Sequence, residues 1–319
     1  MKFPTALVLA CATCAHALKV TVVGGSGFVG ARVCKALVAQ GAECTSLSKT
    51  GSPPAWAAGE SWVSAVAWER VDLLSAESAA LDSVMGSPDA VVSCVGVVDS
   101  DPAVLRRGNG DANIAAFASA KRAGAKRAVY VSVASEVAAC EEAWLPFAKD
   151  EFGAYFEGKR VAEAAAADAV GGDATKLCIV KPTFIYGGDK FEVPLPGKFV
   201  APRVSEGYGA GVEEILSIEL VTAIADRLPG LIKVALRPPV SADAVAAACA
   251  KAALAELTTG DATRRAVGTL DGTAAIRAAA GLLPPTGLAK GLDRALDELG
   301  DLTEKFFKEI EAKLDGRGK

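Results

Sequence analysis

The chain has 319 residues, of which 51% are hydrophobic and 23% are charged, so it can bury a large core and is not disordered overall. Lysine and arginine number 34 against 38 acidic residues, and the net charge of −4 excludes the strongly basic surface typical of nucleic-acid binding. The single histidine, His16, lies near the N-terminus. Ser-His-Asp and Cys-His catalysis and histidine-ligated metal sites are therefore excluded for the rest of the chain.

Residues 1–17 are expected to form a cleaved secretory-type signal. Lys2 supplies a short positive region, Ala6–Ala12 is apolar but too short to span a bilayer, and Ala15–Ala17 is a small-x-small cleavage site. The alternative is an uncleaved extension. Six of the eight cysteines lie beyond this segment without metal-ligand spacing, so we expect neither a metal site nor a disulfide framework. A signal on a chain with reduced cysteines favours an organelle, either a plastid reached through the secretory route or a mitochondrion, over secretion.

From residue 18 onward, strand-like apolar runs alternate with amphipathic helix-like runs. We expect strands at 19–23, 43–47, 65–71, 90–95, 127–133 and 177–180, and helices at 28–39, 75–84, 104–123, 150–167 and 241–253. Continuous apolar strands separated by helices predict an α/β fold, a doubly wound parallel sheet covered by helices on both faces. This nucleotide-binding domain is expected to cover residues 18–256.

Two further regions depart from this alternation. Residues 188–240 are rich in proline and glycine, with a helical piece near 212–227, and are expected to form a small substrate lobe at the carboxyl edge of the sheet. Residues 257–319 are expected to form a helical C-terminal extension. Its segment Leu292–Leu314 carries one apolar stripe, which predicts an amphipathic helix packed on the domain or on a second copy. Docking to a protein complex or a membrane surface remains the alternative.

A glycine-rich stretch joins the first strand to the first helix. Gly24 permits a tight turn, Gly27 lets a pyrophosphate approach the backbone, and Gly30 allows close packing of helix on strand. The helix N-terminus adds N–H donors and a positive dipole end. The sequence therefore predicts a dinucleotide-binding loop made of Gly24, Gly25, Ser26, Gly27, Phe28, Val29 and Gly30.

The end of the second strand bears on which dinucleotide is bound. An acidic residue at this point would bind the ribose of NAD, but the chain has Ser48 and Lys49 there. A hydroxyl and a cation suit a 2′-phosphate, so NADP is favoured over NAD. The alternative for Lys49 is a solvated loop cation.

Tyr155 and Lys159 form a YxxxK pair at the start of the predicted helix 150–167. The spacing of four places both side chains on one helix face. A phenol titrates at about pH 10 and needs a neighbouring cation to exchange protons near neutrality. We expect Lys159 to supply that cation, to lower the pKa of Tyr155 and to bond the nicotinamide ribose.

With these motifs the chain resembles the extended and atypical branches of the short-chain dehydrogenase/reductase superfamily over residues 19–253. The resemblance implies a Rossmann fold. The combination GGSGFVG, SCVG, YFEGKR and KPTFIYG is similar to a narrower group of plastid and mitochondrial NAD(P)-binding proteins, which includes proteins associated with coenzyme Q biosynthesis and the Rossmann accessory subunit of respiratory complex I. It further implies cofactor-holding roles for Asp72, Leu73, Cys94, Val95, Gly96, Asn113, Lys159 and Pro182.

The chain departs from that superfamily at the catalytic hydroxyl, because the aligned position just past the fifth strand is Val133. Ser132 and Ser135 are the two candidates to replace it, and hydrogen bonding at the strand end is the alternative role for both. We therefore expect an NADP-dependent oxidoreductase acting on a small carbonyl or quinone-like, apolar substrate. A non-catalytic, nucleotide-stabilised assembly subunit of an organellar complex is the main alternative, and a nucleotide-sugar epimerase or dehydratase is the third.

Overall fold

The computed structural model describes residues 17–188, 204–255 and 268–283. Within them lies a seven-stranded, wholly parallel sheet in the order β3-β2-β1-β4-β5-β6-β9. The strands are β1 (Lys19–Val23), β2 (Glu43–Ser48), β3 (Val66–Arg70), β4 (Ala90–Ser93), β5 (Arg127–Val131), β6 (Leu177–Lys181) and β9 (Thr269–Asp271). This order confirms the doubly wound sheet that the sequence predicts. The direction of winding reverses between β1 and β4, the place where such sheets bind ligands.

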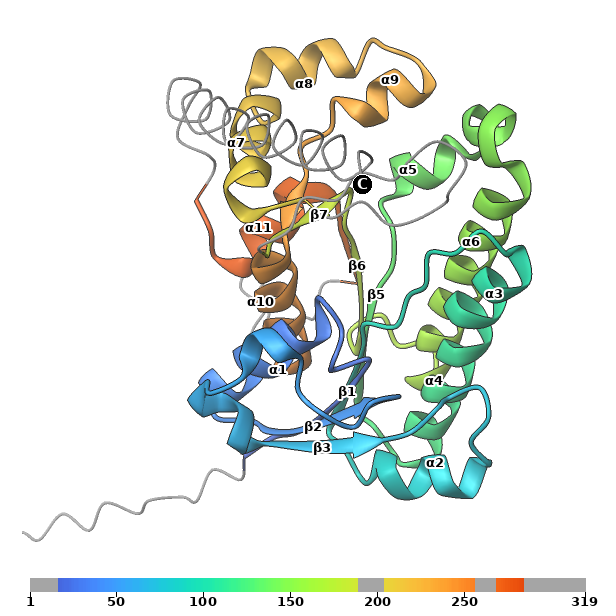
Figure 1. Ribbon diagram of the computed structural model, residues 1–319, viewed down its shortest axis with the longest axis vertical. Helices are drawn as coiled ribbons and strands as arrows, with labels where there is room; N and C mark the ends of the chain where they lie inside the picture. The colour runs from blue at the N-terminus through green and yellow to red at the C-terminus, as the bar shows by residue number, and fades with distance from the viewer. Residues whose placement is uncertain (1–16, 189–203, 256–267, 284–319) are drawn as a thin grey trace, which may run out of the picture.

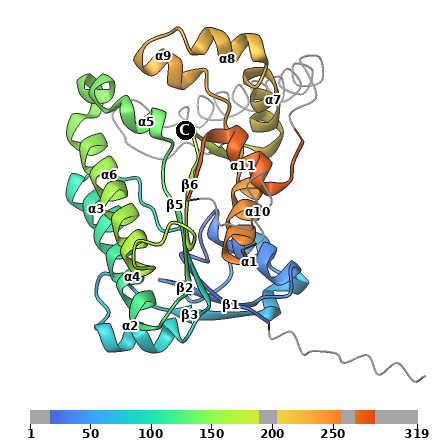
Figure 2. The same cartoon turned by 180° about the vertical axis from the view of Figure 1, so that it is seen from behind.

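Helices cover both faces of the sheet (Figures 1 and 2). Because side chains alternate along a strand, Val22 and Val92 face one core and Val23 and Val91 face the other. The first core is covered by α1 (Gly30–Ala39), α10 (Ala242–Ala253) and α11 (Gly272–Ala280), and the second by α2 (Ser78–Met85), α4 (Ala112–Arg122) and α6 (Glu141–Ala169). Strands β4 and β5, which are buried on both sides, therefore read as largely apolar runs, whereas β2 carries buried polar residues such as Ser46.

The expected helix 104–123 is interrupted. It consists of α3 (Pro102–Arg106), a π-helical turn at Arg107–Asp111, and α4. The segment packs closely against α6, since a Cβ at Gly158 would lie 2.8 Å from the Cβ of Asn109. A π turn inserts one residue into a helix and often lies at a functional site.

The predicted substrate lobe contains α7 (Glu206–Leu216), α8 (Glu219–Ala225) and α9 (Gly230–Ala235), at the top of Figure 1 near α5 (Ser135–Ala139). The single helical piece expected at 212–227 is thus two helices, which separate at Ser217. A short parallel pair, β7 (Ile185–Tyr186) and β8 (Val240–Ser241), joins the lobe to the sheet region. Residues 189–203 of the predicted lobe lie outside the described part of the chain.

A buried charged cluster holds α7 in place. Glu213 is only 1% exposed, and its carboxylate accepts a hydrogen bond of 2.6 Å from the hydroxyl of Tyr186. The guanidinium of Arg277, on α11, lies 2.6 Å from the other carboxylate oxygen. Removing Arg277 would leave the buried charge of Glu213 without a counter-ion, so the cluster ties α7 to α11, and the Tyr186 hydroxyl ties it to β7.

The end of the sheet differs from the sequence-based division. Strand β9 pairs with β6, and α11 follows it, so the sheet continues beyond residue 256 into the segment expected to be a helical extension. A strand of three residues is too short to show a period. The segments 1–16 and Leu292–Leu314, for which a signal and an amphipathic helix are expected, lie outside the described residues. Within the described residues, no helix combines the length and apolarity needed to cross a bilayer.

Candidate functional site

The glycine loop leaves β1 in a turn that only glycine fits well. Gly24 has φ +79°, and a Cβ there would lie 3.2 Å from the side chain of Val95. A Cβ at Gly30 would lie 2.2 Å from the carbonyl oxygen of Gly24, so α1 can begin against the strand end only with glycine at this position. The amide of Gly27 donates to that same carbonyl at 2.9 Å. The loop thus presents open backbone at a helix N-terminus, an arrangement that suits a pyrophosphate.

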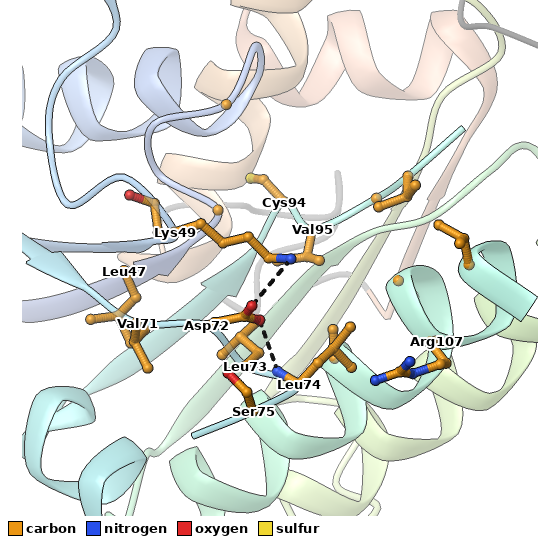
Figure 3. Close-up of a pocket in the computed structure, with 18 residues that line it drawn as sticks. Leu47, Lys49, Val71, Asp72, Leu73, Leu74, Ser75, Cys94, Val95 and Arg107 are labelled. Carbon is orange, nitrogen blue, oxygen red and sulfur yellow. Dashed lines mark hydrogen bonds and ion pairs between the residues drawn. The ribbon is translucent and has the colours of Figure 1, made fainter. Parts of the chain in front are cut away.

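A cavity of about 510 Å³ opens beside this loop, at the carboxyl ends of β1, β2, β3 and β4 (Figure 3). Its volume lies in the range of small-molecule and cofactor sites. Nine residues expected to bind the cofactor line it: Gly24, Gly27, Ser48, Lys49, Asp72, Leu73, Cys94, Val95 and Gly96. The remaining lining residues were missed by the sequence analysis: Leu47, Val71, Leu74, Ser75, Val97, Val104, Arg107, Gly108 and Ala112.

Hydroxyl groups gather at the end of β2. The hydroxyls of Ser26 and Ser48 lie 2.8 Å apart, and the amide of Gly51 donates to the Ser48 hydroxyl at 3.0 Å. The ammonium of Lys49 lies 3.4 Å from a carboxylate oxygen of Asp72, and the Lys49 side chain is 69% exposed. Lys49 is therefore paired across the cavity mouth while remaining open to solvent and to a ligand. Asp72 also accepts a hydrogen bond of 3.1 Å from the amide of Leu74.

Two buried asparagines shape the far wall of the cavity. The amide nitrogen of Asn113 donates to the carbonyls of Val95 and Asn109, at 3.3 and 2.8 Å, and its oxygen accepts from Ser93. Asn109 both donates to and accepts from the backbone of Val97, at 2.8 and 3.1 Å. Asn113, expected at the cofactor, thus lies behind the wall and positions it. Asn109 was missed, because its burial follows from the π turn and not from any motif.

Lys159 lies on α6, next to the end of β4. Its side chain is 5% exposed, its ammonium donates to the carbonyl of Val131 at 3.1 Å, and a Cβ at Gly96 would lie 3.3 Å from it. Burial lowers the pKa of Lys159 to about 8, although Cys94 and Glu163 oppose the shift. Gly96, which lines the cavity, therefore lies between Lys159 and the open space.

Tyr155 lies one turn before Lys159, and the ammonium is 5.7 Å from the centre of its ring. Burial raises the pKa of Tyr155 to about 12. The expectation that Lys159 lowers this pKa is therefore wrong for the chain by itself. The physical reason is that the ammonium bonds the Val131 carbonyl while the phenol loses its hydration.

The two candidate serines differ in their surroundings. Ser132 is 5% exposed and donates a hydrogen bond of 2.6 Å to Glu163, which also lies 2.9 Å from the ammonium of Lys181. Ser135 is exposed at the start of α5 and its amide donates to Asp271 at 3.1 Å. Between them, Val133 is buried in an apolar cluster. Ser132 therefore already has a strong acceptor, and only Ser135 is exposed.

Four other expected cofactor residues, Gly25, Phe28, Val29 and Pro182, do not line the cavity. Gly25 packs on Ser46, and Phe28 is 45% exposed with its ring 4.7 Å from the guanidinium of Arg32. Val29 is buried at the start of α1. The carbonyl of Pro182 accepts from Ala134 at 2.8 Å and so fixes the segment after β5.

Cysteines contribute to packing in this region. The six within the described residues are free thiols, and burial raises the pKa of Cys94 to about 12. No group of three metal-ligating side chains occurs in the described part of the chain.

Comparison with known proteins gives both a family match and a curated relative. The model of the NAD dependent epimerase/dehydratase family matches residues 20–216. An uncharacterized chloroplastic protein of Arabidopsis thaliana is 34% identical over 180 residues, which are 56% of this chain and 55% of that protein. The match thus spans about half the length of this curated relative.

Two solved structures resemble the fold over most of its length. A putative epimerase of Burkholderia cenocepacia is 18% identical, with a TM-score of 0.51, covering 88% of this chain and 97% of that one. The UDP-glucose 4-epimerase of Thermotoga maritima, solved with UDP-glucose, is 13% identical, with a TM-score of 0.52, covering 90% of this chain and 100% of that one. At such identities the likeness is one of fold.

Proposed function

We propose that this chain, which belongs to the NAD-dependent epimerase/dehydratase family, is an NAD(P)-dependent oxidoreductase acting on a small carbonyl or quinone-like molecule. One observation carries the proposal: the buried ammonium of Lys159 lies between Tyr155 and Gly96, and Gly96 lines the cavity beside the glycine loop. The residues that we propose to transfer the proton and to bind the nucleotide thus lie at the same carboxyl edge of the sheet.

The cavity fits a dinucleotide on its own geometry. Gly24 and Gly30 keep the backbone clear of side chains at the start of α1, and the apolar wall near Val71, Leu73 and Val95 suits a flat base. When bound, the dinucleotide supplies the hydride that is exchanged with the substrate. The chain's own residues bind it, orient the substrate and handle the proton.

Tyr155 acts as the proton donor in the proposed reaction. With a pKa raised to about 12, its phenol is protonated at neutral pH and ready to donate to a carbonyl oxygen. Lys159, with a pKa of about 8, is mostly protonated at pH 7 and stabilises the phenolate that forms when the proton leaves. Activity should therefore fall as the pH rises through about 8.

Substrate orientation is the weak point of the site. Val133 has no hydroxyl, and the Ser132 hydroxyl already donates a hydrogen bond to Glu163. Ser135 is the residue we propose to polarise the carbonyl, with turnover slower than in a site that has a second fixed donor.

We infer a preference for NADP from the end of β2. Ser48 and Lys49 line the cavity there and offer a hydroxyl and a cation, without an acidic residue on that strand end. The test is calorimetric titration of the 18–319 chain with NADPH and NADH, followed by turnover assays on carbonyls and quinones. Tight NADPH binding with turnover supports the proposal. Absence of binding by either dinucleotide would contradict it.

A non-catalytic, nucleotide-stabilised subunit is the second candidate, in keeping with the resemblance to coenzyme Q-associated proteins and the complex I Rossmann subunit. The observation that favours it is the missing hydroxyl at Val133. NADPH binding that raises the melting temperature, with no turnover on any carbonyl, quinone or UDP-sugar, would support this candidate. Turnover of UDP-glucose alone would instead indicate an epimerase, the activity of the Thermotoga maritima structure of similar fold.

We propose an organelle as the compartment. The signal-like residues 1–17 and the chloroplastic relative in Arabidopsis thaliana support this location. Localisation of a C-terminal fluorescent fusion in the native cell, with N-terminal sequencing of the mature chain, tests it. A mature N-terminus at Leu18 and an organellar signal are expected, and retention of residues 1–17 in the cytosol would contradict the proposal.

A further inference from the structure

Three charged side chains line the cavity: Lys49, Asp72 and Arg107. Lys49 and Asp72 lie 3.4 Å apart and compensate each other. Arg107 comes from the opposite wall and points into the cavity (Figure 3). Among the described residues its guanidinium has neither an ion pair nor a hydrogen bond. The described cavity lining therefore carries one uncompensated positive charge.

Local packing explains why this arginine points inward. The preceding residue, Arg106, turns the other way and pairs with Glu157 of α6 at 2.9 Å. Gly108 packs directly on Val97, since a Cβ there would lie 2.6 Å from it. Asn109 is bonded to the Val97 backbone. With the π turn held on both sides, Arg107 projects from a fixed piece of backbone.

The surroundings of Arg107 are those of a base and not of a phosphate. In Figure 3 its guanidinium points towards Leu74, just after the segment Val71–Leu73 at the end of β3. Val104 and Ala112 complete an apolar slot. The pyrophosphate-binding features, Gly24, Gly27 and the start of α1, belong to the glycine loop instead. A planar guanidinium beside an apolar slot is suited to stacking on an aromatic ring.

We propose that Arg107 stacks on the adenine of the bound dinucleotide and holds it against the segment after β3. The inference rests on the proposed dinucleotide binding and assigns Arg107 as a binding residue for the adenosine half. It differs in kind from the role inferred for Lys49, because stacking on adenine contributes equally to NADH and NADPH.

The test is calorimetric titration of the full chain and its variants with NADH, NADPH and ADP-ribose. Because Arg107 is exposed, Arg107→Ala should weaken binding of all three by about fivefold, the upper size expected for a cation–π contact at an exposed site. Arg107→Lys should not restore affinity, because an ammonium keeps the charge but lacks the plane. Arg106→Ala is the matched control, with affinities within about twofold of wild type.

The outcomes separate this inference from the proposed function. Wild-type protein that binds neither dinucleotide overturns both. Wild-type protein that binds, together with an Arg107→Ala variant that binds equally well, overturns only the role of Arg107. Full restoration by lysine would show that the charge of Arg107 matters and its plane does not, and a loss confined to NADPH would place Arg107 at the 2′-phosphate; either result would reject stacking. Unchanged melting temperatures of the unliganded variants establish that each loss reflects binding and not folding.

Discussion

The two halves of the site are built differently. In the glycine-loop half, between β1 and β4, the geometry comes from backbone held by local turns, and the side chains around the cavity leave about 510 Å³ of space. In the half formed by α6 and the ends of β5 and β6, side chains bond each other and the backbone: Ser132 to Glu163, Glu163 to Lys181, and Lys159 to the Val131 carbonyl. The first half is therefore sensitive to added atoms, and the second to lost or altered charges.

The largest effect is expected where one side chain transfers the proton. Tyr155→Phe should lower turnover by about 10²- to 10⁴-fold with little change in NADPH affinity, because it removes the donor and keeps the ring. Steady-state kinetics and calorimetry measure the two quantities.

Tyr130→Phe is the matched control. The ring of Tyr130 lies 5.1 Å from the Lys159 ammonium, but its buried hydroxyl has no hydrogen-bond partner among the described residues. Its removal should leave turnover unchanged and leave stability equal or higher. Equal losses in both variants would reject Tyr155 as the donor.

In the glycine-loop half, an added side chain should reduce stability and nucleotide binding through steric overlap. Gly30→Ala places a Cβ 2.2 Å from the Gly24 carbonyl oxygen, so we expect the free energy of unfolding to fall by about 2–3 kcal/mol and nucleotide binding to be lost. Chemical denaturation and calorimetry measure both.

Gly41→Ala separates overlap from backbone strain. Gly41 has φ +78°, but no atom lies within 4 Å of the point that an added Cβ would occupy, so alanine should cost about 1 kcal/mol and leave binding intact. A Gly30→Ala chain that still binds NADPH normally would contradict the packing role of Gly30.

In the half that contains Lys159, the free energy of unfolding should depend on pH. Burial lowers the folded-state pKa of Lys159 from 10.5 to about 8, so the unfolded chain binds this proton more tightly. The resulting destabilisation is fully present below about pH 8 and is lost as the pH rises towards 10.5. Lys159→Met removes it, and we expect a gain of about 2 kcal/mol at pH 7, with turnover lost.

The measurement compares urea unfolding of both chains at pH 7 and pH 9.5. The gain should shrink at the higher pH. A gain that is independent of pH, or a loss of stability at pH 7, would show that Lys159 is not destabilised by burial.

The smallest effect on stability is expected at Lys49. Because its pair with Asp72 is exposed, Lys49→Ala should change the free energy of unfolding by less than about 1 kcal/mol. NADPH affinity should nevertheless fall about tenfold at low salt while NADH affinity stays constant. Equal effects on both dinucleotides would place Lys49 away from the 2′-phosphate.

Much of the fold could be predicted because its signals are local. Strands such as Ala90–Ser93 are buried on both faces and read as apolar runs, and the glycine spacing reports one tight turn. Strand β9 has three residues, of which only Leu270 is buried, so no period marks it. Its place in the sheet depends on pairing with β6, which no local pattern records.

By itself, the sequence determined the first six strands of the sheet, the glycine loop at the start of α1 and the shared helix face of Tyr155 and Lys159, because each depends on neighbouring residues. Tertiary structure alone decided which charges are buried and which hydroxyls are engaged. Ser132 meets Glu163, 31 positions away, only because α6 packs across β5. Arg107 reaches the cavity only because a π turn is held between Val97 and α6. Burial and long-range pairing arise from how elements pack, and it is these that set the pKa of Lys159 and the chemistry available at the site.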